Sequence, residues 1–240
     1  MTILVTNDDG DSEGLRILLR VAEKFDKSYA IIPNRQRSAV SGALTMHKPI
    51  RLHKIEKNIH SINGTPSDCV LFSIFSDEFK KPDMVLSGIN WGDNAGIDCL
   101  LGSGTVAACW QAALEGIPAI AFSMAKEKRD WGKGNWGDKE KIANLVEDLI
   151  KELKPKLKPD KFFNVNLPLE PEDAEIVYMQ KMQRDRFSVN IEKRTDPYGN
   201  PYFWINGVLK KVERGTDVYE VIENKKIVIT EISLSVFEKD

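Results

Sequence analysis

Cysteine and histidine are scarce in this sequence, with three of each among 240 residues. Cys69, Cys99 and Cys109 are odd in number and show no Cys-x-x-Cys spacing, which argues against a disulfide framework or a zinc knuckle. We therefore expect a reducing, cytoplasmic location. No apolar run reaches the ~18 residues of a membrane span, and the apolar N-terminus lacks the preceding basic stretch of a secretion signal. We expect no membrane partner.

An excess of one charge is also missing, because 34 Lys and Arg residues nearly balance 36 Asp and Glu residues. Proteins that coat nucleic acid usually carry a basic excess, so we do not expect a polymeric nucleic acid as the main partner. The sequence has neither a GxxxxGK[ST] phosphate loop nor the Gly-x-Ser-x-Gly turn of serine hydrolases. Its 42% hydrophobic and 29% charged residues are typical of a folded globular chain.

Apolar runs and amphipathic segments alternate along much of the chain. Apolar runs that end in polar clusters predict buried parallel strands at 2–6, 29–32, 83–86 and 119–123. The spacing of apolar residues predicts a helix at 13–25. We also expect helices at 66–76, which follows a possible N-cap, and at 103–114, which is rich in alanine. A further helix at 139–153 and a strand at 161–166 follow. This order predicts an α/β fold with a doubly wound, mainly parallel sheet covered on both faces.

Local signals mark the ends of several elements. Thr65 is a predicted N-cap with Pro66 in the first helical turn, and Gly116 has the position of a C-cap glycine. Residues 124–138 are polar and rich in glycine, which predicts an exposed loop.

The chain changes character in its last third, where strands predominate. The predicted turns lie at 196–201 and 223–226. The run Tyr202–Ile205 is unusually aromatic for a hairpin strand, so it needs either the body or a second subunit to pack on. We divide the chain into a core at 1–167 and a β-rich extension at 168–240, which completes the core and carries an extended hairpin.

Asp8 and Asp9 directly follow the first predicted strand. Two adjacent carboxylates repel each other, and burying them is costly without a cation. Oxygen ligands of this kind suit a hard divalent ion such as Mg²⁺ or Mn²⁺. The alternative is that one aspartate caps the next helix while the other is solvated.

Other polar side chains follow the next strands and should lie at the same edge of the sheet. Ser38 offers a hydroxyl to a metal or a phosphate, unless its loop with Arg35 and Arg37 is simply solvated. Asn90 and Asn94 offer a carbonyl to a metal or an amide to a phosphate. Their alternative role is conformational, because Asn next to Gly is common in turns.

Ser103, Gly104 and Thr105 stand at the start of a predicted helix. Backbone N–H groups at a helix start, with glycine allowing close approach, form a cradle for an anion. The two hydroxyls can add donors. The alternative is a plain N-cap formed by Ser103 or Thr105.

Taken together, these segments resemble one family, that of the stationary-phase survival protein SurE. The matching pieces are NDDG at 7–10, RQRSAVSGALT at 35–45, GTPSDCV at 64–70, SGIN at 87–90, SGTVAA at 103–108, GIPAIAFS at 116–123, DPYGNPYFWING at 196–207 and GTD at 215–217. The resemblance covers most of the chain, and the ordered set of pieces is specific although each piece is short.

The resemblance implies both a fold and an activity. The family has a Rossmann-like α/β core and a C-terminal hairpin that exchanges between subunits, giving homodimers and sometimes homotetramers. Its members are metal-dependent 5′/3′-nucleotidases and acid phosphatases. The expected reaction is therefore hydrolysis of nucleoside 5′- or 3′-monophosphates, small-molecule substrates, to nucleoside and phosphate.

The resemblance also assigns residues by position. Asp8, Asp9, Ser38 and Asn90 match the family's ligands for one divalent ion per subunit, Mg²⁺ or Mn²⁺. The substrate and phosphate side is matched by Asn7, Asn94, Ser103, Gly104 and Thr105. Asp8 or Asp9 would in addition orient the attacking water or act as a base, which makes both of them candidate catalytic residues.

Two departures from the family pattern lie near the expected pocket mouth. Residues 11–14 are one residue shorter and more acidic than the family's His-Ala-Pro-Gly loop, and one residue is added between Asp98 and Ser103. Both changes leave the metal-ligand positions intact and bear on substrate preference.

Three other functions remain open at this point. One is a broader acid phosphatase or exopolyphosphatase, and another is a regulator that binds nucleotide without cleaving it. A receiver-type signalling module also has an acidic pair after its first strand. That module needs an Asp and a Lys at later strand ends, where this sequence has Ser87-Gly88 and Ser123-Met124.

Overall fold

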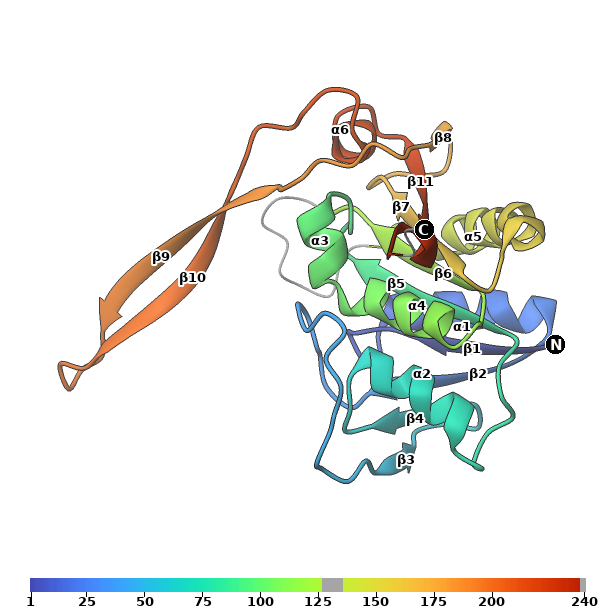
Figure 1. Ribbon diagram of the computed structural model, residues 1–240. Coiled ribbons are helices and arrows are strands. Elements are labelled where there is room, and N and C mark those ends of the chain that lie inside the picture. Colours follow the sequence, from blue (N-terminus) through green and yellow to red (C-terminus); the bar gives the residue numbers. More distant parts are fainter. Residues whose placement is uncertain (127–135, 238–240) are drawn as a thin grey trace.

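Strand β1 (Thr2–Thr6), in which every residue is buried, lies in the interior of a nine-stranded sheet (Figure 1). The computed structural model describes residues 1–126 and 136–237. The strand order of the sheet is β3-β4-β2-β1-β5-β6-β7-β11-β8. The remaining strands of the sheet are β2 (Lys27–Pro33), β3 (Leu52–Lys54), β4 (Ile59–Ile62), β5 (Met84–Trp91), β6 (Ala119–Met124), β7 (Lys161–Leu167), β8 (Ile176–Tyr178) and β11 (Ile227–Ser233).

Most neighbouring strands of this sheet run parallel. β1 pairs with β2 on one side and with β5 on the other, and β6 and β7 continue the parallel set beyond β5. β3 and β11 run antiparallel to their neighbours β4 and β7. The predicted α/β fold with a doubly wound, mainly parallel sheet is confirmed.

Helices cover both faces of the sheet. α1 (Glu13–Phe25) and α5 (Lys139–Leu153) pack on one face, and α2 (Pro66–Phe75) and α4 (Gly104–Leu114) pack on the other. The shorter elements are α3 (Ile97–Gly102), α6 (Asp217–Ile222) and the 3₁₀ turns Lys154–Lys156 and Leu234–Phe237. α1 and α5 have the predicted bounds. Among the described residues, no helix has the length and apolarity needed to cross a bilayer.

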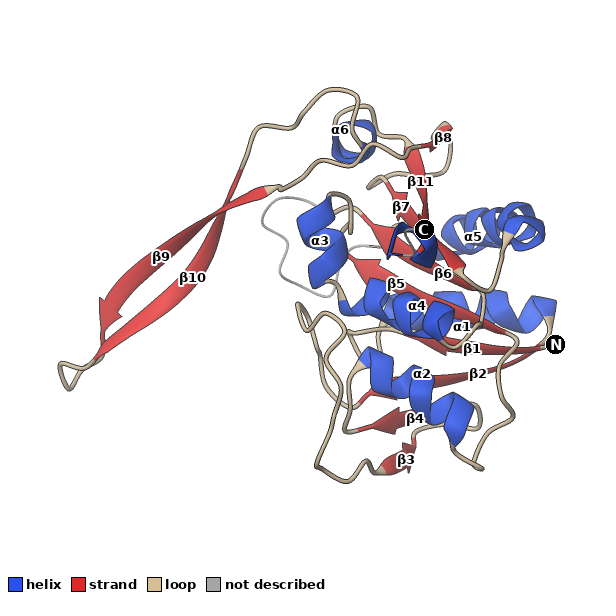
Figure 2. Cartoon of the chain, in the orientation of Figure 1, coloured by secondary structure: helices blue, strands red, loops and turns tan. Residues whose placement is uncertain are grey.

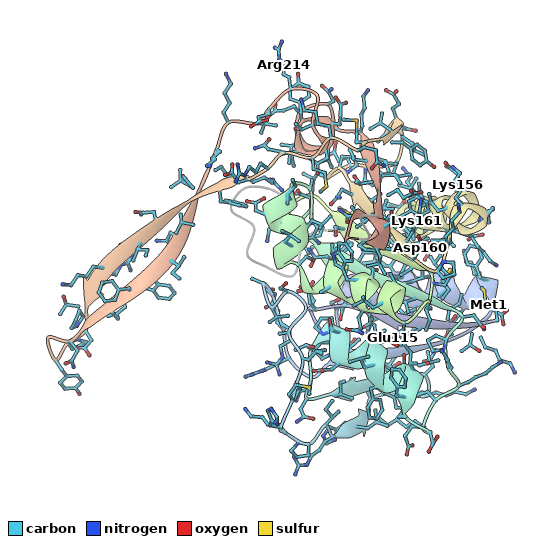
Figure 3. The ribbon with its side chains drawn as sticks, viewed as in Figure 1. Met1, Glu115, Lys156, Asp160, Lys161 and Arg214 are labelled. Carbon is cyan, nitrogen blue, oxygen red and sulfur yellow. The ribbon has the colours of Figure 1, made fainter. Side chains whose placement is uncertain are left out.

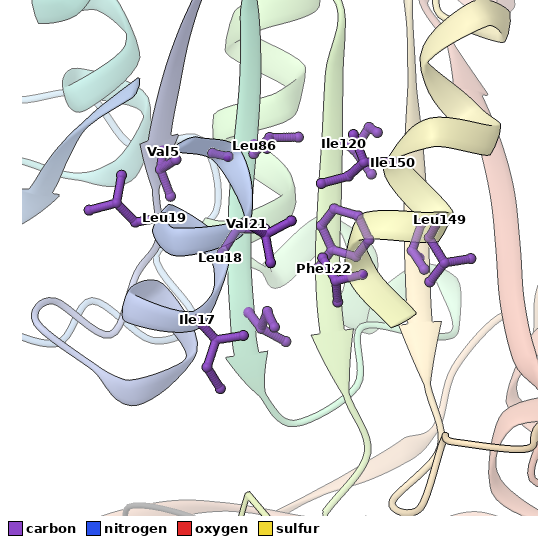
Figure 4. Packing of buried hydrophobic residues seen from close by; sticks show 14 of the residues in the cluster. Val5, Ile17, Leu18, Leu19, Val21, Leu86, Ile120, Phe122, Leu149 and Ile150 are labelled. Carbon is purple, nitrogen blue, oxygen red and sulfur yellow. The ribbon is translucent and has the colours of Figure 1, made fainter. Parts of the chain in front are cut away.

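Alternate residues of β1 contribute to two separate hydrophobic clusters. Ile3 and Val5 belong to the cluster with α1 and α5, whereas Leu4 belongs to the cluster with α2 and α4. Figure 4 shows part of the first cluster, in which Leu18 of α1 and Leu149 of α5 join side chains from β1, β5 and β6. Burial of one such aliphatic side chain contributes about 1.5–3 kcal/mol, so β1 is held from both layers.

The ends of two helices have the predicted local chemistry. Thr65 Oγ1 accepts the Asp68 N–H at 3.2 Å, and Asp68 Oδ2 accepts the Thr65 N–H at 2.8 Å, which forms a capping box ahead of Pro66. Gly116 has a φ of +71° and directly follows Glu115, the C-cap of α4. That left-handed conformation is the reason for glycine at this position.

The short elements β3, β4, α3 and α6 and the two 3₁₀ turns were not predicted from the sequence. β3 and β4 have three and four residues, too few to show a periodicity, and β4 is fixed by its pairing with β2. The region beyond residue 174 was predicted to contain strands and turns. That prediction was wrong at 217–222, where the chain forms helix α6. The predicted turn at 223–226 directly follows this helix.

The predicted exposed loop at 124–138 agrees with Lys126, Gly137 and Asp138, which are exposed and lie outside helices and strands, but it was wrong at three other described residues. Met124 is the last residue of β6 and is buried, as is Ala125. Trp136 is also buried and packs against Trp91, with ring centroids 4.9 Å apart. Residues 127–135 of that prediction lie outside the described residues.

The C-terminal extension contributes two strands to the central sheet, because β11 and β8 lie beyond β7. Between them in sequence, β9 (Phe187–Thr195) and β10 (Pro201–Leu209) form a separate antiparallel pair. Figure 2 shows this hairpin, residues 187–209, extending away from the body, and we call it the arm. The division of the chain at 167 and 168 stays a prediction.

We expect Thr65→Ala to lower the free energy of unfolding by about 1–2 kcal/mol, because it removes the N-cap acceptor. It also removes the hydrogen bond that Thr65 Oγ1 donates to Ala43 O at 2.6 Å. Chemical denaturation followed by circular dichroism would measure the change. Ser235→Ala, at an exposed position outside the arm, is the control and should change stability by less than about 0.5 kcal/mol. Equal stability of Thr65→Ala and the wild type would contradict the expectation.

Candidate functional site

The candidate site lies where the strand order of the sheet reverses. From β1 the chain proceeds to β2 on one side, and it later returns to β5 on the other side of β1 (Figure 1). In doubly wound sheets, ligands bind outside the carboxyl ends of the strands at such a switch point. The residues that follow β1 and those that end β5 therefore meet in one place.

Asp8 is buried, with 5% of its surface exposed, and it accepts hydrogen bonds from the start of α4. Thr105 Oγ1 donates to Asp8 Oδ1 at 2.6 Å, and the Gly104 backbone N–H also donates to the carboxylate. A side chain at position 104 would not fit, since its Cβ would lie 2.8 Å from Asp8 Cβ. Glycine thus lets the positive end of the α4 dipole approach the carboxylate.

Asp9 is half-buried and contacts two further segments of the site. Gln36 Nε2 donates to Asp9 Oδ1 at 3.1 Å, and the Trp91 backbone N–H donates to the same carboxylate. The Arg37 backbone N–H donates to Asp8 O at 2.7 Å. The loop after β2 and the end of β5 therefore both touch the acidic pair.

The acidic pair lies in an environment that disfavours its negative charge. Burial raises the pKa of Asp8 to about 7, and the charge of the neighbouring Asp9 adds to this shift. Burial also raises the pKa of Asp9. A bound cation would relieve both effects, because an opposite charge stabilises the ionised carboxylates.

The donor chemistry around the pair suits a hard cation with mostly oxygen ligands. No group of three or more His, Cys, Asp and Glu side chains suited to a metal occurs within residues 1–126 and 136–237. A cation beside Asp8 and Asp9 would therefore need neutral oxygens as its further ligands. The residues present fit that requirement through Ser38 and Asn90.

Asn90 lies near the end of β5, just after an irregularity in that strand. The register between β5 and β6 shifts between Ser87 and Asn90, and such a bulge re-aims a side chain. Gly88 permits the close packing, because a Cβ there would lie 2.2 Å from Phe122 O. Asn90 Nδ2 donates to Gly92 O at 2.5 Å, so Asn90 Oδ1 is the atom that a cation would meet.

Ser38 is the exposed member of the predicted ligand set and lies in the turn one residue after Arg37. Because the Arg37 backbone is bonded to Asp8 O, this turn runs alongside the acidic pair. The four predicted metal ligands thus come from three segments that the fold brings to one edge of the sheet. Their roles as ligands stay predictions.

Two of the predicted alternatives can now be decided. Ser12 is the N-cap of α1, where its Oγ accepts the Leu15 N–H at 3.3 Å, so neither aspartate caps that helix. Ser103 is the N-cap of α4, where its Oγ accepts the Val106 N–H at 3.1 Å. The capping role of Ser103 leaves its hydroxyl hydrogen for another acceptor.

The predicted phosphate-side asparagines already bond protein groups. Asn7 Nδ2 donates to Gly10 O at 2.8 Å and to Ser12 Oγ at 3.0 Å, which closes the turn after β1. Asn94 Nδ2 donates to Ser123 Oγ at 2.7 Å. Their roles toward phosphate stay predictions. A hydrogen bond from the Asn7 amide to phosphate would replace one of its two bonds, whereas Asn94 Nδ2 has a second N–H to donate.

Two residues near the acidic pair were not singled out in the sequence. Gln36 lies in the loop after β2 and donates a hydrogen bond to Asp9. The sequence pointed to it only through its place in that loop. The positive charge of Lys126 lowers the pKa of Asp9. The sequence feature that could have identified Lys126 is its position just beyond β6, at the carboxyl edge of the sheet, where ligands of this architecture bind.

Fold and site together define a doubly wound α/β protein with an acidic candidate cation site beside a helix N-terminus. The family model "Survival protein SurE" matches residues 3–189. The chain belongs to the SurE family, as the sequence motifs predicted.

Individual relatives agree with this assignment over nearly the whole chain. The protein is 37% identical over 242 residues to the 5′-nucleotidase SurE of Thermofilum pendens, covering 98% of this chain and 91% of that protein. It is 38% identical over 225 residues to the 5′-nucleotidase SurE of Neisseria gonorrhoeae, with 92% and 88% covered. The crystal structure of the SurE protein from Aquifex aeolicus has a TM-score of 0.79 and 29% identity, and it covers 100% of both chains.

The raised pKa of Asp8 predicts that the metal-free protein loses stability as the pH rises. The pKa near 7 in the folded state exceeds the ordinary value of 3.8, so the folded state binds the proton more tightly than the unfolded state. The free energy of unfolding therefore falls between about pH 4 and about pH 7.

Asp8→Asn removes this titration and keeps an oxygen for the Thr105 hydroxyl. We expect the variant to exceed the wild type in stability near pH 8 by more than ~1.4 kcal/mol, the free energy of one pKa unit. Urea unfolding in EDTA at low and high pH would measure the difference. Asp77→Asn, at an exposed position, should behave as the wild type. The same pH dependence in Asp8→Asn and the wild type would refute the shift.

Proposed function

We propose that this protein is a metal-dependent nucleotidase that hydrolyses nucleoside 5′- or 3′-monophosphates to nucleoside and phosphate. The observation that carries the proposal is the buried Asp8 beside Asp9, held against the N-terminus of α4. This arrangement combines a place for a cation with backbone N–H groups that suit a phosphate. Relatives named 5′-nucleotidase SurE extend over 98% of the chain.

We assign Asp8, Asp9, Ser38 and Asn90 to one divalent ion per subunit, Mg²⁺ or Mn²⁺. When bound, such an ion supplies positive charge that polarises a phosphoryl oxygen and lowers the pKa of water. The hydrogen bond from Thr105 holds the Asp8 carboxylate in one orientation. Asp9 is more exposed, so its carboxylate is the candidate to orient the attacking water or accept its proton.

Ser103, Gly104 and Thr105 are the proposed contacts of the phosphoryl group. Because α4 begins at Gly104, its first N–H groups and its dipole favour an anion at this point. Donors fixed in a helix need no reorganisation when charge moves between the phosphoryl oxygens in the transition state. Asn7 and Asn94 would support the same group from the turns after β1 and β5.

The other candidate functions differ from this proposal in their tests. A broader acid phosphatase or exopolyphosphatase would use the same phosphate chemistry, and a substrate profile separates it from a nucleotidase. The regulator and the receiver module are not favoured, since the relatives that cover the chain are named as nucleotidases. The predicted cytoplasmic location is supported by three free cysteines.

Asp8→Asn should lower metal-dependent phosphate release by more than ~100-fold, because it removes a ligand charge that the reaction needs. The assay would use nucleoside 5′- and 3′-monophosphates and short polyphosphate, with Mg²⁺, Mn²⁺ or EDTA. Asp77→Asn is the matched control for loss of one carboxylate. Full turnover by Asp8→Asn at ordinary metal concentration would exclude the assigned site.

We further propose that the arm joins subunits into a homodimer or homotetramer. Val189, Ile191, Phe203 and Ile205 are 73%, 62%, 58% and 77% exposed. The strand register places them on one face of the arm, because Ile191 lies opposite Ile205 and side chains alternate along each strand. Figure 3 shows arm side chains projecting into open space. An isolated two-stranded hairpin is marginally stable, so this apolar face needs a partner.

Replacing Ile191 and Ile205 together by Glu should dissociate the assembly, because two charges would enter an apolar contact. Sedimentation velocity over a range of concentrations would follow the change. The matched control replaces Asn190 and Asn206 by Glu, an opposed pair on the other face of the arm. A wild-type protein that stays monomeric at every concentration would rule out the proposed assembly.

A further inference from the structure

The segment Asp93–Asp98 connects the candidate site with the C-terminal extension. It begins shortly after Asn90 at the end of β5 and contains Asn94. Residues 93–96 belong to no helix or strand, so their geometry depends on contacts made by other parts of the chain.

Residues 183–186, which directly precede the arm and which we call its root, make several of these contacts. The Ile97 N–H donates to Gln183 O at 2.8 Å. The Arg186 N–H donates to Asp98 Oδ2 at 2.8 Å. The root therefore holds the C-terminal end of the segment through its backbone.

Asp217, at the start of α6, joins the same two pieces of chain. Its Oδ2 accepts the Gly96 N–H at 2.6 Å, and its Oδ1 accepts the Gln183 N–H at 2.9 Å. Gly96 also lies close to the arginine of the root, since a Cβ there would be 3.1 Å from Arg186 Cγ. The middle of the segment is thus fixed against both the root and α6.

The first residue of the segment is held by a buried ion pair. Arg186 Nη1 contacts Asp93 Oδ1, and the two side chains are 12% and 8% exposed. At this burial the guanidinium and the carboxylate depend on each other, because removing one leaves an uncompensated charge. Arg186 thus holds both ends of the segment, Asp93 with its side chain and Asp98 with its backbone.

Movement of Asp93 would be transmitted to the candidate site over a very short distance. Trp91 and Gly92 alone separate Asn90 from Asp93. Gly92 O accepts the Asn90 side-chain amide at 2.5 Å, and the Trp91 N–H bonds the Asp9 carboxylate. The orientation of Asn90 therefore depends on where Asp93 is held, together with the pairing of Asn90, Trp91 and Gly92 with β6.

We propose that Arg186 is a positioning residue of the candidate metal site. Through Asp93 it fixes the start of the segment that follows Asn90 and contains Asn94, although it belongs to the C-terminal extension and not to the core strands. This inference rests on the proposed ligand set. It gives the root of the arm a role in metal binding as well as in the placement of the arm.

The test compares three variants of the full chain. Arg186→Met removes the charge, and Arg186→Lys keeps the charge without the planar fork. Lys210→Met is the matched control, because it removes another ion pair of the root, to Asp185 at 2.7 Å, that is solvent-exposed. The readouts are the Mn²⁺ dissociation constant from electron paramagnetic resonance, kcat and KM for a nucleoside monophosphate, and thermal unfolding as a check of folding.

Arg186→Met should raise the Mn²⁺ dissociation constant and lower kcat, each by about 10–100-fold, as found for residues that orient metal ligands. Arg186→Lys should recover part of both losses, and Lys210→Met should match the wild type. If Arg186→Met does not fold, Arg186→Lys and the double variant Asp93→Asn/Arg186→Met, which leaves no unpaired charge, carry the comparison.

Wild-type Mn²⁺ affinity and kcat in folded Arg186 variants would overturn the proposal, as would equal losses in Lys210→Met. A wild-type protein that binds Mn²⁺ without releasing phosphate would refute the proposed function alone, since the Mn²⁺ comparison still decides the role of Arg186. A wild-type protein that binds no Mn²⁺ would overturn the positioning role together with the site.

Discussion

Burial of two adjacent carboxylates at the end of β1 is the constraint on which the site depends. β1 is an interior strand with every residue buried, so the turn that follows it emerges inside the protein rather than on an open surface. The charges of Asp8 and Asp9 are disfavoured there, and burial raises both pKa values. The polar groups around the pair, from the loop after β2, the end of β5 and the start of α4, partly offset that cost. A cation would complete the compensation.

The sheet order explains why these distant segments meet. Because the chain leaves β1 toward β2 and returns to β5, the turns after β1 and β5 lead to opposite faces of the sheet at one point of its edge. Close packing near this edge needs glycine at two points. Gly104 brings α4 against Asp8, and Gly88 brings β5 against the Phe122 carbonyl. The C-terminal extension acts at the same edge, since its root and Asp217 hold the segment that follows Asn90.

The central strands and long helices were predictable because their signals are local. A strand buried on both faces leaves a continuous apolar run, and α2 has its capping box in the sequence. β3, β4 and α6 were missed because they are short and are formed by tertiary contacts. The acidic pair was predictable from two carboxylates next to a buried strand. The contacts of Arg186 and Asp217 could not be predicted in this way. Arg186 lies 93 residues from its partner Asp93, and Asp217 lies 121 residues from its partner Gly96.

The position of β11 has a consequence for how the protein forms during synthesis. β11, residues 227–233, pairs with β7, and β8 joins the sheet through β11. Until residues 227–233 leave the ribosome, β7 keeps an open edge with unpaired backbone groups, although the acidic turn and α4 are already available. The central sheet therefore cannot be completed strand by strand in the order in which the chain is synthesised. Completion of the sheet waits for β11 to emerge, and during that interval the exposed edge of β7 is the part of the nascent protein that a chaperone would need to cover.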